Sequence, residues 1–340
     1  MPARAFVSGC SGLALTPDER VFFRDAEPWG LILFGRNISA HEQIRALVAD
    51  FREAVGRADA PVLIDQEGGR VRRLRPPLAL DHPPARAYGA LHALDPDAAL
   101  EAARTGAQLM AAELAALGIT VDCLPVLDLP AAGMTDAIGD RAYAERAETV
   151  SALGRAVCEG ALAAGVLPVI KHMPGHGRAT VDSHHHLPTV AADRATLEAT
   201  DFAPFRALAH MPLGMTGHIV FEAIDAERPA TLSPVVLGEI VRGHIGFDGL
   251  LMSDDLSMKA LSGPVGASAG AALAAGCDIA LHCNGDMGEM VEVAAAAPRL
   301  EGRALERAER ALGLIASPGA SDVAELAARR DALLGRLPTA

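Results

Sequence analysis

The chain has 340 residues, half of them apolar, which is enough to bury one large core or two ordinary ones. Acidic residues outnumber basic ones by 43 to 30, so the net field repels a phosphate backbone and we expect no nucleic-acid partner. We find no secretory leader and no apolar run of membrane-spanning length, which predicts a soluble, cytoplasmic protein that binds no membrane. The five cysteines form no Cys-X-X-Cys pair, and we expect reduced, mostly buried thiols.

In chain order, short apolar runs alternate with longer amphipathic or alanine-rich stretches. This repeat is typical of parallel strands joined by helical crossovers. The predicted strands cover residues 5–8, 30–34, 62–65, 121–127, 167–171, 214–219, 250–253 and 279–283. Eight such strands indicate an α/β fold closed into a single (β/α)8 barrel of the TIM type.

The helix predicted after the second strand illustrates the crossover signal. Ser39 and Glu42 have the spacing of a capping box, and apolar residues from Ile44 to Val55 recur on one helical face. No Pro/Gly/Ser hinge divides the chain, so we expect one domain over residues 1–340, with two terminal helices packed outside the barrel. Further helices are predicted at about 96–117, 145–164, 193–208, 234–241, 265–275 and 288–297, and the terminal helices at 303–315 and 322–337.

Ionisable residues follow four of the predicted strands, at Asp65, at Lys171 and His172, at His218 and at Asp254. One acidic residue after a strand is usually only a helix N-cap or a turn former. Four such strand ends are harder to explain in that way, because isolated charges at a barrel mouth cost desolvation energy unless a polar group binds there. Since the carboxyl ends of barrel strands form the active site, the pattern predicts a site for a small polar ligand.

The segment 171–186 contains five histidines and Asp182. Proline and glycine separate His172 from His176, so these two do not share a helical face as they would in a zinc-protease motif. A zinc site made by the histidines remains an open alternative. A Gly-X-Gly pair also begins here, but Thr180 replaces the third glycine of a dinucleotide motif, which argues against a dinucleotide site.

Four blocks of sequence carry a family resemblance. They are residues 31–37, 64–71, 171–177 continuing to 182–184, and 246–249 continuing to 253–258. The blocks span most of the predicted barrel, and the lysine-histidine loop and the serine-aspartate-aspartate strand end form a specific combination. The chain resembles glycoside hydrolase family 3, and within it the single-domain bacterial β-N-acetylglucosaminidases that recycle cell-wall fragments.

The resemblance implies roles for eight residues. Asp254 would be the nucleophile, His184 the general acid/base, and Asp182 the partner that orients His184. The residues that would hold the N-acetylglucosamine ring are Asp65, Arg73, Arg141, Lys171 and His172.

Two departures from the family pattern occur near these residues. Asp140 stands before Arg141 where glutamate is commoner, but this neighbour is not the sugar-binding residue. His185 and His186 leave the histidine assignment ambiguous by one position, and we choose His184 because its spacing from Asp182 matches the family.

The activity implied is that of a retaining exo-β-N-acetylglucosaminidase, a glycoside hydrolase that forms a covalent glycosyl-aspartate. Its substrate would be a small carbohydrate from peptidoglycan, N-acetylglucosamine linked to anhydro-N-acetylmuramic acid with or without peptide, and no cofactor, metal or obligatory protein partner is implied. An imidazole suits the acid/base role because it can give a proton to the leaving sugar and then take one from water. The alternatives are a metal-dependent hydrolase that uses the histidine loop, a family 3 glycoside phosphorylase, and a sugar-binding protein without turnover.

Overall fold

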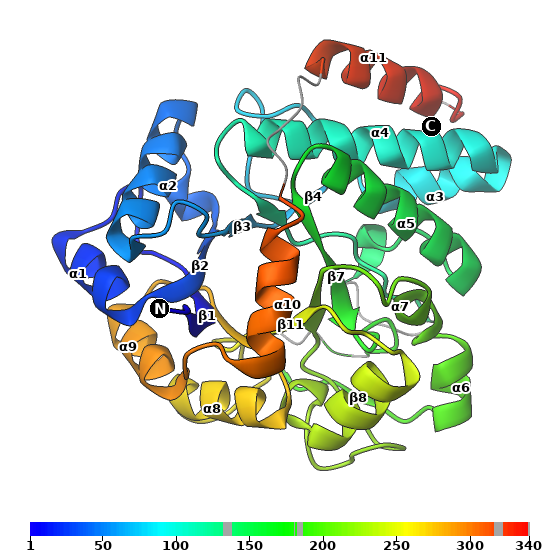
Figure 1. Ribbon diagram of the computed structural model, residues 1–340. Helices are drawn as coiled ribbons and strands as arrows, with labels where there is room; N and C mark the ends of the chain where they lie inside the picture. Colours follow the sequence, from blue (N-terminus) through cyan, green and yellow to red (C-terminus); the bar gives the residue numbers. More distant parts are fainter. Residues whose placement is uncertain (132–137, 180, 182–185, 316–321, 339–340) are drawn as a thin grey trace.

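In the computed structural model, which describes residues 1–131, 138–179, 181, 186–315 and 322–338, parallel strands close into a barrel (Figure 1). Each strand expected from the sequence contributes to it, and the predicted (β/α)8 TIM-type fold is confirmed. The eight strands, in their order around the barrel, are β1 (Arg4–Ser8), β2 (Pro28–Leu33), β3 (Val62–Ile64), β6 (Val121–Asp122), β7 (Leu167–Met173), β9 (Leu213–Thr216), β11 (Leu250–Asp255) and β12 (Ile279–His282).

The strand β6 ends at Asp122, earlier than the predicted limit of residue 127. Pro125 interrupts the ladder because a proline has no N–H to donate. Beyond Pro125 the chain pairs with its neighbour β7 again through an isolated bridge between Val126 and Lys171. Asp128 therefore lies beyond the strand proper, in irregular backbone on the carboxyl side of the barrel.

Helices surround the barrel and connect its strands (Figure 1). The helix predicted at 234–241 is a π-helix over Val236–His244. The α-helices are α1 (Pro17–Ala26), α2 (His41–Val55), α3 (Ala85–Leu94), α4 (Pro96–Ala115), α5 (Ala147–Ala163), α6 (Arg194–Ala199), α7 (Ala203–Ala207), α8 (Val265–Ala275), α9 (Met287–Ala296), α10 (Gly302–Leu312) and α11 (Val323–Leu334).

The capping box predicted at Ser39 is wrong. The helix α2 begins at His41 with Ala40 as its N-cap, and this cap makes no side-chain hydrogen bond. The Ser39 hydroxyl donates instead to Oε1 of Gln43, at 3.1 Å, so it does not accept from the helix backbone. A capping box does occur at α1, where Thr16 and Glu19 satisfy each other's backbone N–H groups.

The helix predicted over residues 193–208 is split into α6 and α7. The reason is Pro204, whose ring would clash with the carbonyl of Thr200 if the helix were continuous. Thr200 accordingly ends α6, and Pro204 occupies the first turn of α7, where its missing N–H costs nothing.

The base of the barrel, where the strands begin, is covered by α10, which lies across it in Figure 1. Ala308 and Ala311 of α10 are buried in one apolar cluster with inward-facing barrel residues such as Leu63 and Leu250. The last helix, α11, packs along α4. Within the described residues, no helix combines the length and the apolar character needed to cross a bilayer.

Candidate active site

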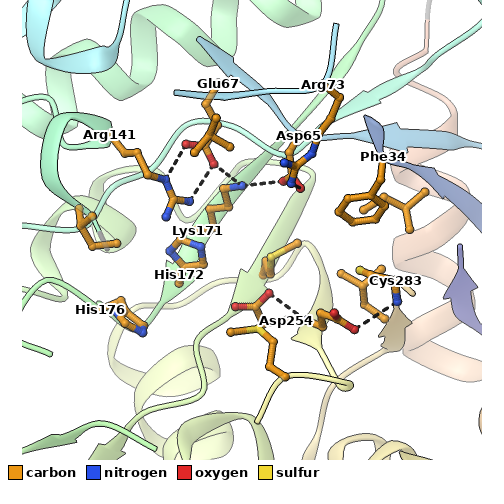
Figure 2. A pocket seen from close by; sticks show the side chains of 17 residues that line it. Phe34, Asp65, Glu67, Arg73, Arg141, Lys171, His172, His176, Asp254 and Cys283 are labelled. Carbon is orange, nitrogen blue, oxygen red and sulfur yellow. Dashed lines mark hydrogen bonds and ion pairs between the residues drawn. The ribbon is translucent and has the colours of Figure 1, made fainter. Parts of the chain in front are cut away.

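A cavity of about 240 Å³ opens at the carboxyl ends of the barrel strands (Figure 2). Six of the eight predicted site residues line it, and the described residues around them include acids, bases and apolar groups. The predicted residues in this wall are Asp65, Arg73, Arg141, Lys171, His172 and Asp254.

One wall of the cavity is a chain of alternating charges (Figure 2). Arg141 donates to both carboxylate oxygens of Glu67, from Nε and from Nη2, each at 2.8 Å. Lys171 Nζ lies 2.7 Å from Oε1 of Glu67 and 3.0 Å from Oδ1 of Asp65. Arg73 Nη2 then donates to Oδ2 of Asp65 at 2.7 Å. Three cations and two carboxylates thus hold one another in a line, and the wall carries one net positive charge.

The charges of this wall are stabilised against the cost of their burial. Burial raises the pKa of Asp65, but Lys171 and Arg73 outweigh it and hold that pKa well below its usual range. Glu67 behaves alike: burial raises its pKa, while Arg141 and Lys171 bring it down to about 2. Burial lowers the pKa of Lys171, but Asp65 and Glu67 raise it above its ordinary value. The whole chain of charges is therefore ionised at neutral pH.

Glu67 is a site residue that the sequence interpretation did not single out. It lies on β4 (Gln66–Gly68), which forms a short antiparallel hairpin with β5 (Val71–Arg72) directly after β3. The Gln66 side chain accepts from the backbone N–H groups of Arg73 and Leu74 and so closes the hairpin. The signal available in the sequence was the position of Glu67 two residues after Asp65, which places both carboxylates at one strand end.

The opposite side of the cavity contains Asp254, at the end of β11. Its Oδ1 accepts the backbone N–H of Asp255 at 2.8 Å. Burial raises the pKa of Asp254, but His172, His218, the Asp255 N–H and Lys171 together lower it below its ordinary value. The side chain is thus an ionised carboxylate that faces the cavity (Figure 2).

The neighbouring Asp255 is engaged elsewhere, although it also lines the cavity. Its carboxylate accepts from the backbone and hydroxyl of Ser257, at 3.1 and 2.7 Å, and from the N–H of Cys283 at 3.2 Å. The carboxylate of Asp255 therefore stabilises the loop after β11. Of the two adjacent aspartates, Asp254 has the lone pairs available to react.

Two histidines line the cavity next to Asp254: His172 lies between Asp254 and the charged wall, and His176 lies beyond His172, farther from that wall (Figure 2). His172 bonds through Nδ1 to Asp128, at 2.7 Å, and its ring meets that of His176 edge-on with centroids 5.8 Å apart. Burial is the main reason that the pKa of His176 falls to about 4, so its ring is neutral. Neither ring nitrogen of His176 has a hydrogen-bond partner in the described part of the chain.

The remaining sequence predictions fall outside the cavity or outside the described residues. Asp182 and His184 belong to the undescribed residues, so the structure places neither. His218, expected among the charged groups of the mouth, is fully buried and bonds to the Thr231 hydroxyl at 2.8 Å and the Asp255 carbonyl at 3.0 Å. Among the residues that the structure describes, no group of three His, Cys, Asp or Glu side chains is arranged to hold a metal ion.

A (β/α)8 barrel whose mouth holds fixed cations opposite an ionised carboxylate is the arrangement of an enzyme that acts on a small polar substrate. Residues 18–312 match the family described as Glycosyl hydrolase family 3 N terminal domain. A β-hexosaminidase from Chromobacterium violaceum is 39% identical, with 98% of each chain covered. The chain belongs to glycosyl hydrolase family 3.

Solved structures agree with this assignment. NagZ from Neisseria gonorrhoeae in complex with N-trifluoroacetyl-D-glucosamine superposes with a TM-score of 0.88 at 31% identity, covering 98% of both chains. The same Neisseria protein in complex with a zinc ion gives a TM-score of 0.86 at 30% identity, again over 98% of each chain. The predicted enzyme class, a glycoside hydrolase of the β-N-acetylhexosaminidase type, is confirmed.

Proposed function

We propose that the chain is a retaining exo-β-N-acetylglucosaminidase that forms a covalent glycosyl intermediate on Asp254. The observation that carries the proposal is the contrast across the cavity: within the described residues the ionised carboxylate of Asp254 accepts only the backbone N–H of Asp255, while the opposite wall presents cations already fixed in place. A retaining mechanism needs such a carboxylate beside the anomeric carbon. The fixed cations and carboxylates suit the hydroxyl groups of a pyranose ring.

The reaction would proceed in two displacements. Asp254 attacks the anomeric carbon, the bond from that carbon to the glycosidic oxygen breaks, and His184 gives its proton to the departing oxygen. Water then attacks the anomeric carbon and returns its proton to His184, while the bond to Asp254 breaks and the carboxylate is restored. The proposed role of Asp182 is to orient His184 and to favour its charged form.

The arrangement also supports a role for the predicted sugar-binding residues. Asp65, Arg73, Lys171 and Arg141 would hold the ring hydroxyls, and His172 would contact the ring from the side of Asp254. Ion pairs that already exist without substrate reduce the cost of ordering the site when substrate binds.

We propose a fragment of peptidoglycan as the natural substrate, with N-acetylglucosamine at its non-reducing end, and the cytoplasm as the compartment. The Neisseria relative, described as a complex with N-trifluoroacetyl-D-glucosamine, supports the sugar. The five cysteines, all buried thiols, suit a reducing compartment. In this proposal residues 1–340 act as one catalytic domain, with α10 and α11 as its terminal helices.

Mechanism-based labelling tests the proposal. A 2-acetamido-2-deoxy-5-fluoroglycosyl fluoride should trap the glycosyl-enzyme, and peptide mass spectrometry should locate the label on Asp254. A label on Asp255, or no label in an active enzyme, would contradict the mechanism. Rates on nitrophenyl glycosides and purified muropeptides, each with and without phosphate, would define the substrate and separate hydrolysis from phosphorolysis.

A zinc-dependent hydrolase is the second candidate, and the zinc complex of the Neisseria relative favours testing it. Elemental analysis of the purified protein and activity after chelation answer the question. We expect substoichiometric zinc and unchanged activity. One bound zinc per chain together with loss of activity on chelation would replace the two-displacement mechanism.

A further inference from the structure

Asp128 is a fully buried carboxylate behind the cavity wall, in the irregular segment after β6. Within the described residues its hydrogen bonds come from His172, near the end of β7, and from His176, just after that strand. Its Oδ2 bonds to Nδ1 of His172 at 2.7 Å, and its Oδ1 accepts the backbone N–H groups of His172 at 3.3 Å and His176 at 2.7 Å. One side chain therefore connects to both ends of a five-residue turn.

These contacts determine the tautomer and the direction of His172. An ionised carboxylate can only accept, so Nδ1 of His172 must carry the proton that it shares with Asp128. Burial raises the pKa of Asp128, but His172 and His176 outweigh it and keep the pKa below its ordinary value, so the carboxylate is ionised. The second nitrogen, Nε2, lies on the far side of the ring and is left for the cavity that His172 lines.

We propose that Asp128 is a positioning residue that acts through His172: it fixes the ring so that Nε2 meets the bound sugar beside Asp254. The inference rests on the proposed function, since it takes the ligand to be a 2-acetamido sugar. Asp128 itself lies outside the lining of the cavity and would touch no substrate. Its effect on substrate should vanish when the imidazole of His172 is absent.

A comparison with Asp122 separates this role from ordinary burial. Asp122 also lies on the β6 side of the barrel and is buried, but it accepts the backbone N–H of Gln66, at 2.9 Å. Burial raises the pKa of Asp122 well above its usual range, and asparagine, which keeps an oxygen to accept from Gln66, should replace it with little change. Asp128 instead carries a charge directed at an imidazole, as the carboxylate partner of a functional histidine does.

A double-mutant cycle tests the inference, with Asp128→Asn, His172→Ala and the double variant compared with the wild type. The readouts are kcat and KM for nitrophenyl N-acetylglucosaminide and the dissociation constant of N-trifluoroacetyl-D-glucosamine, measured by fluorine NMR. We expect Asp128→Asn to weaken kcat/KM and binding by roughly 10- to 100-fold, the effect of losing a charge-assisted hydrogen bond. The double variant should be no worse than His172→Ala. Losses that multiply in the double variant would overturn the inference.

The matched control is Asp122→Asn, which should keep the wild-type kcat, KM and ligand affinity. The two readouts separate the inference from the proposed function. A wild type that binds the ligand but does not cleave the glycoside defeats the proposed function, and the binding cycle still decides the role of Asp128. A wild type that cleaves but gives multiplicative losses defeats only the inference, and a wild type that neither binds nor cleaves defeats both.

A measurement on folded wild-type protein covers the case in which Asp128→Asn does not fold. The proton shared by His172 and Asp128 should give a far-downfield NMR signal, because short charge-assisted hydrogen bonds deshield the proton. The signal should be missing from His172→Ala and present in Asp122→Asn. Absence of the signal from the wild type, or its persistence in His172→Ala, would overturn the inference.

Discussion

Both ends of the barrel carry networks of acidic and basic side chains. The network at the base lies around packed apolar side chains, whereas the network at the mouth lies around a cavity. At the base, Arg303 of α10 lies 2.9 Å from Asp248, which lies two residues before β11. Asp278, which precedes β12, pairs with Arg242 at 2.7 Å and with Arg307 at 3.0 Å. These pairs surround apolar side chains of α10 and of the inner barrel, so the base is closed.

At the mouth the same residue types surround a cavity. The Lys171 side chain is 3% exposed and that of Glu67 is 6% exposed. At the base Asp278 is equally buried, at 6%, but Arg303 is 61% exposed. Buried pairs are fixed and shielded from water, while exposed pairs contribute little because solvent screens them. Charge clusters alone therefore do not identify the active site. The comparison predicts that changes at the mouth reduce activity and that changes at the base reduce stability.

Replacement of Asp254 by alanine should give the largest effect on activity. The variant loses the nucleophile, and with it the two-step route, so we expect kcat to fall by roughly 10⁴-fold or more. Steady-state rates on nitrophenyl N-acetylglucosaminide provide the measurement, and thermal unfolding provides the control that the chain stays folded. A folded Asp254→Ala protein with the wild-type rate would refute the prediction that changes at the mouth reduce activity.

Replacement of His184 by alanine should rank second, with a loss of roughly 10²- to 10⁴-fold for the general acid/base. A leaving group that needs no proton, such as dinitrophenolate, should restore most of the first step. The comparison of nitrophenyl and dinitrophenyl substrates under single-turnover conditions measures this. Equal losses on both substrates, or a greater loss in His186→Ala, would move the acid/base role to another residue.

The fold was predictable because its signal is local. Each barrel strand is a short apolar run, and each crossover is longer and periodic, so the alternation alone indicated the barrel. The errors arose where a distant or specific contact overrides the local pattern. The Ser39 hydroxyl donates to Gln43 and does not cap the helix as predicted. Pro204 ends one helix and begins another, although the apolar pattern continues across it.

The lining of the cavity was predictable where strand ends position it, as at Lys171 and Asp254. Glu67 was missed because its role depends on Arg141, which lies 74 residues further along the chain. Asp128 was missed because Pro125 interrupts β6, which ends at Asp122. Asp128 therefore does not follow directly on a strand, and the search for ionisable residues at strand ends does not find it. Partners that meet only in three dimensions cannot be inferred from spacing.

Replacement of Glu67 by glutamine should reduce kcat/KM by roughly 10- to 100-fold, chiefly through KM. Glutamine keeps the shape but removes the charge that faces Arg141 and Lys171, so both cations lose their fixed position. The matched control is Glu113→Gln, whose carboxylate pairs with His82 away from the cavity. An unchanged KM in a folded Glu67→Gln enzyme would show that this wall does not position the sugar-binding cations.

The same variant should alter how stability depends on pH. Glu67 has a pKa of about 2 in the folded chain against an ordinary 4.5, so the stability it contributes is fully present above 4.5 and is lost as pH falls toward 2. We expect the wild type to exceed Glu67→Gln in unfolding free energy by a constant amount near neutral pH and by a shrinking amount in acid. Urea unfolding at a series of pH values measures this, and a difference independent of pH down to the acid limit would contradict the ionised state of Glu67.

Replacement of Asp278 by alanine should have the smallest effect on activity. It removes a buried carboxylate from Arg242, Arg307 and the backbone N–H of Leu251, so we expect a loss of about 3 kcal/mol in unfolding free energy.

Asp248→Ala removes a half-exposed carboxylate and should cost about 1 kcal/mol or less, with the difference vanishing in high salt. Both variants should keep kcat/KM within about twofold of the wild type while folded, because additivity holds for sites with no shared partners. Denaturant unfolding and steady-state kinetics at two salt concentrations decide the matter. A base variant that lost activity without unfolding would show that the mouth depends on the base. The apolar cluster between α10 and the inner barrel would then have to transmit the structural change to the active site.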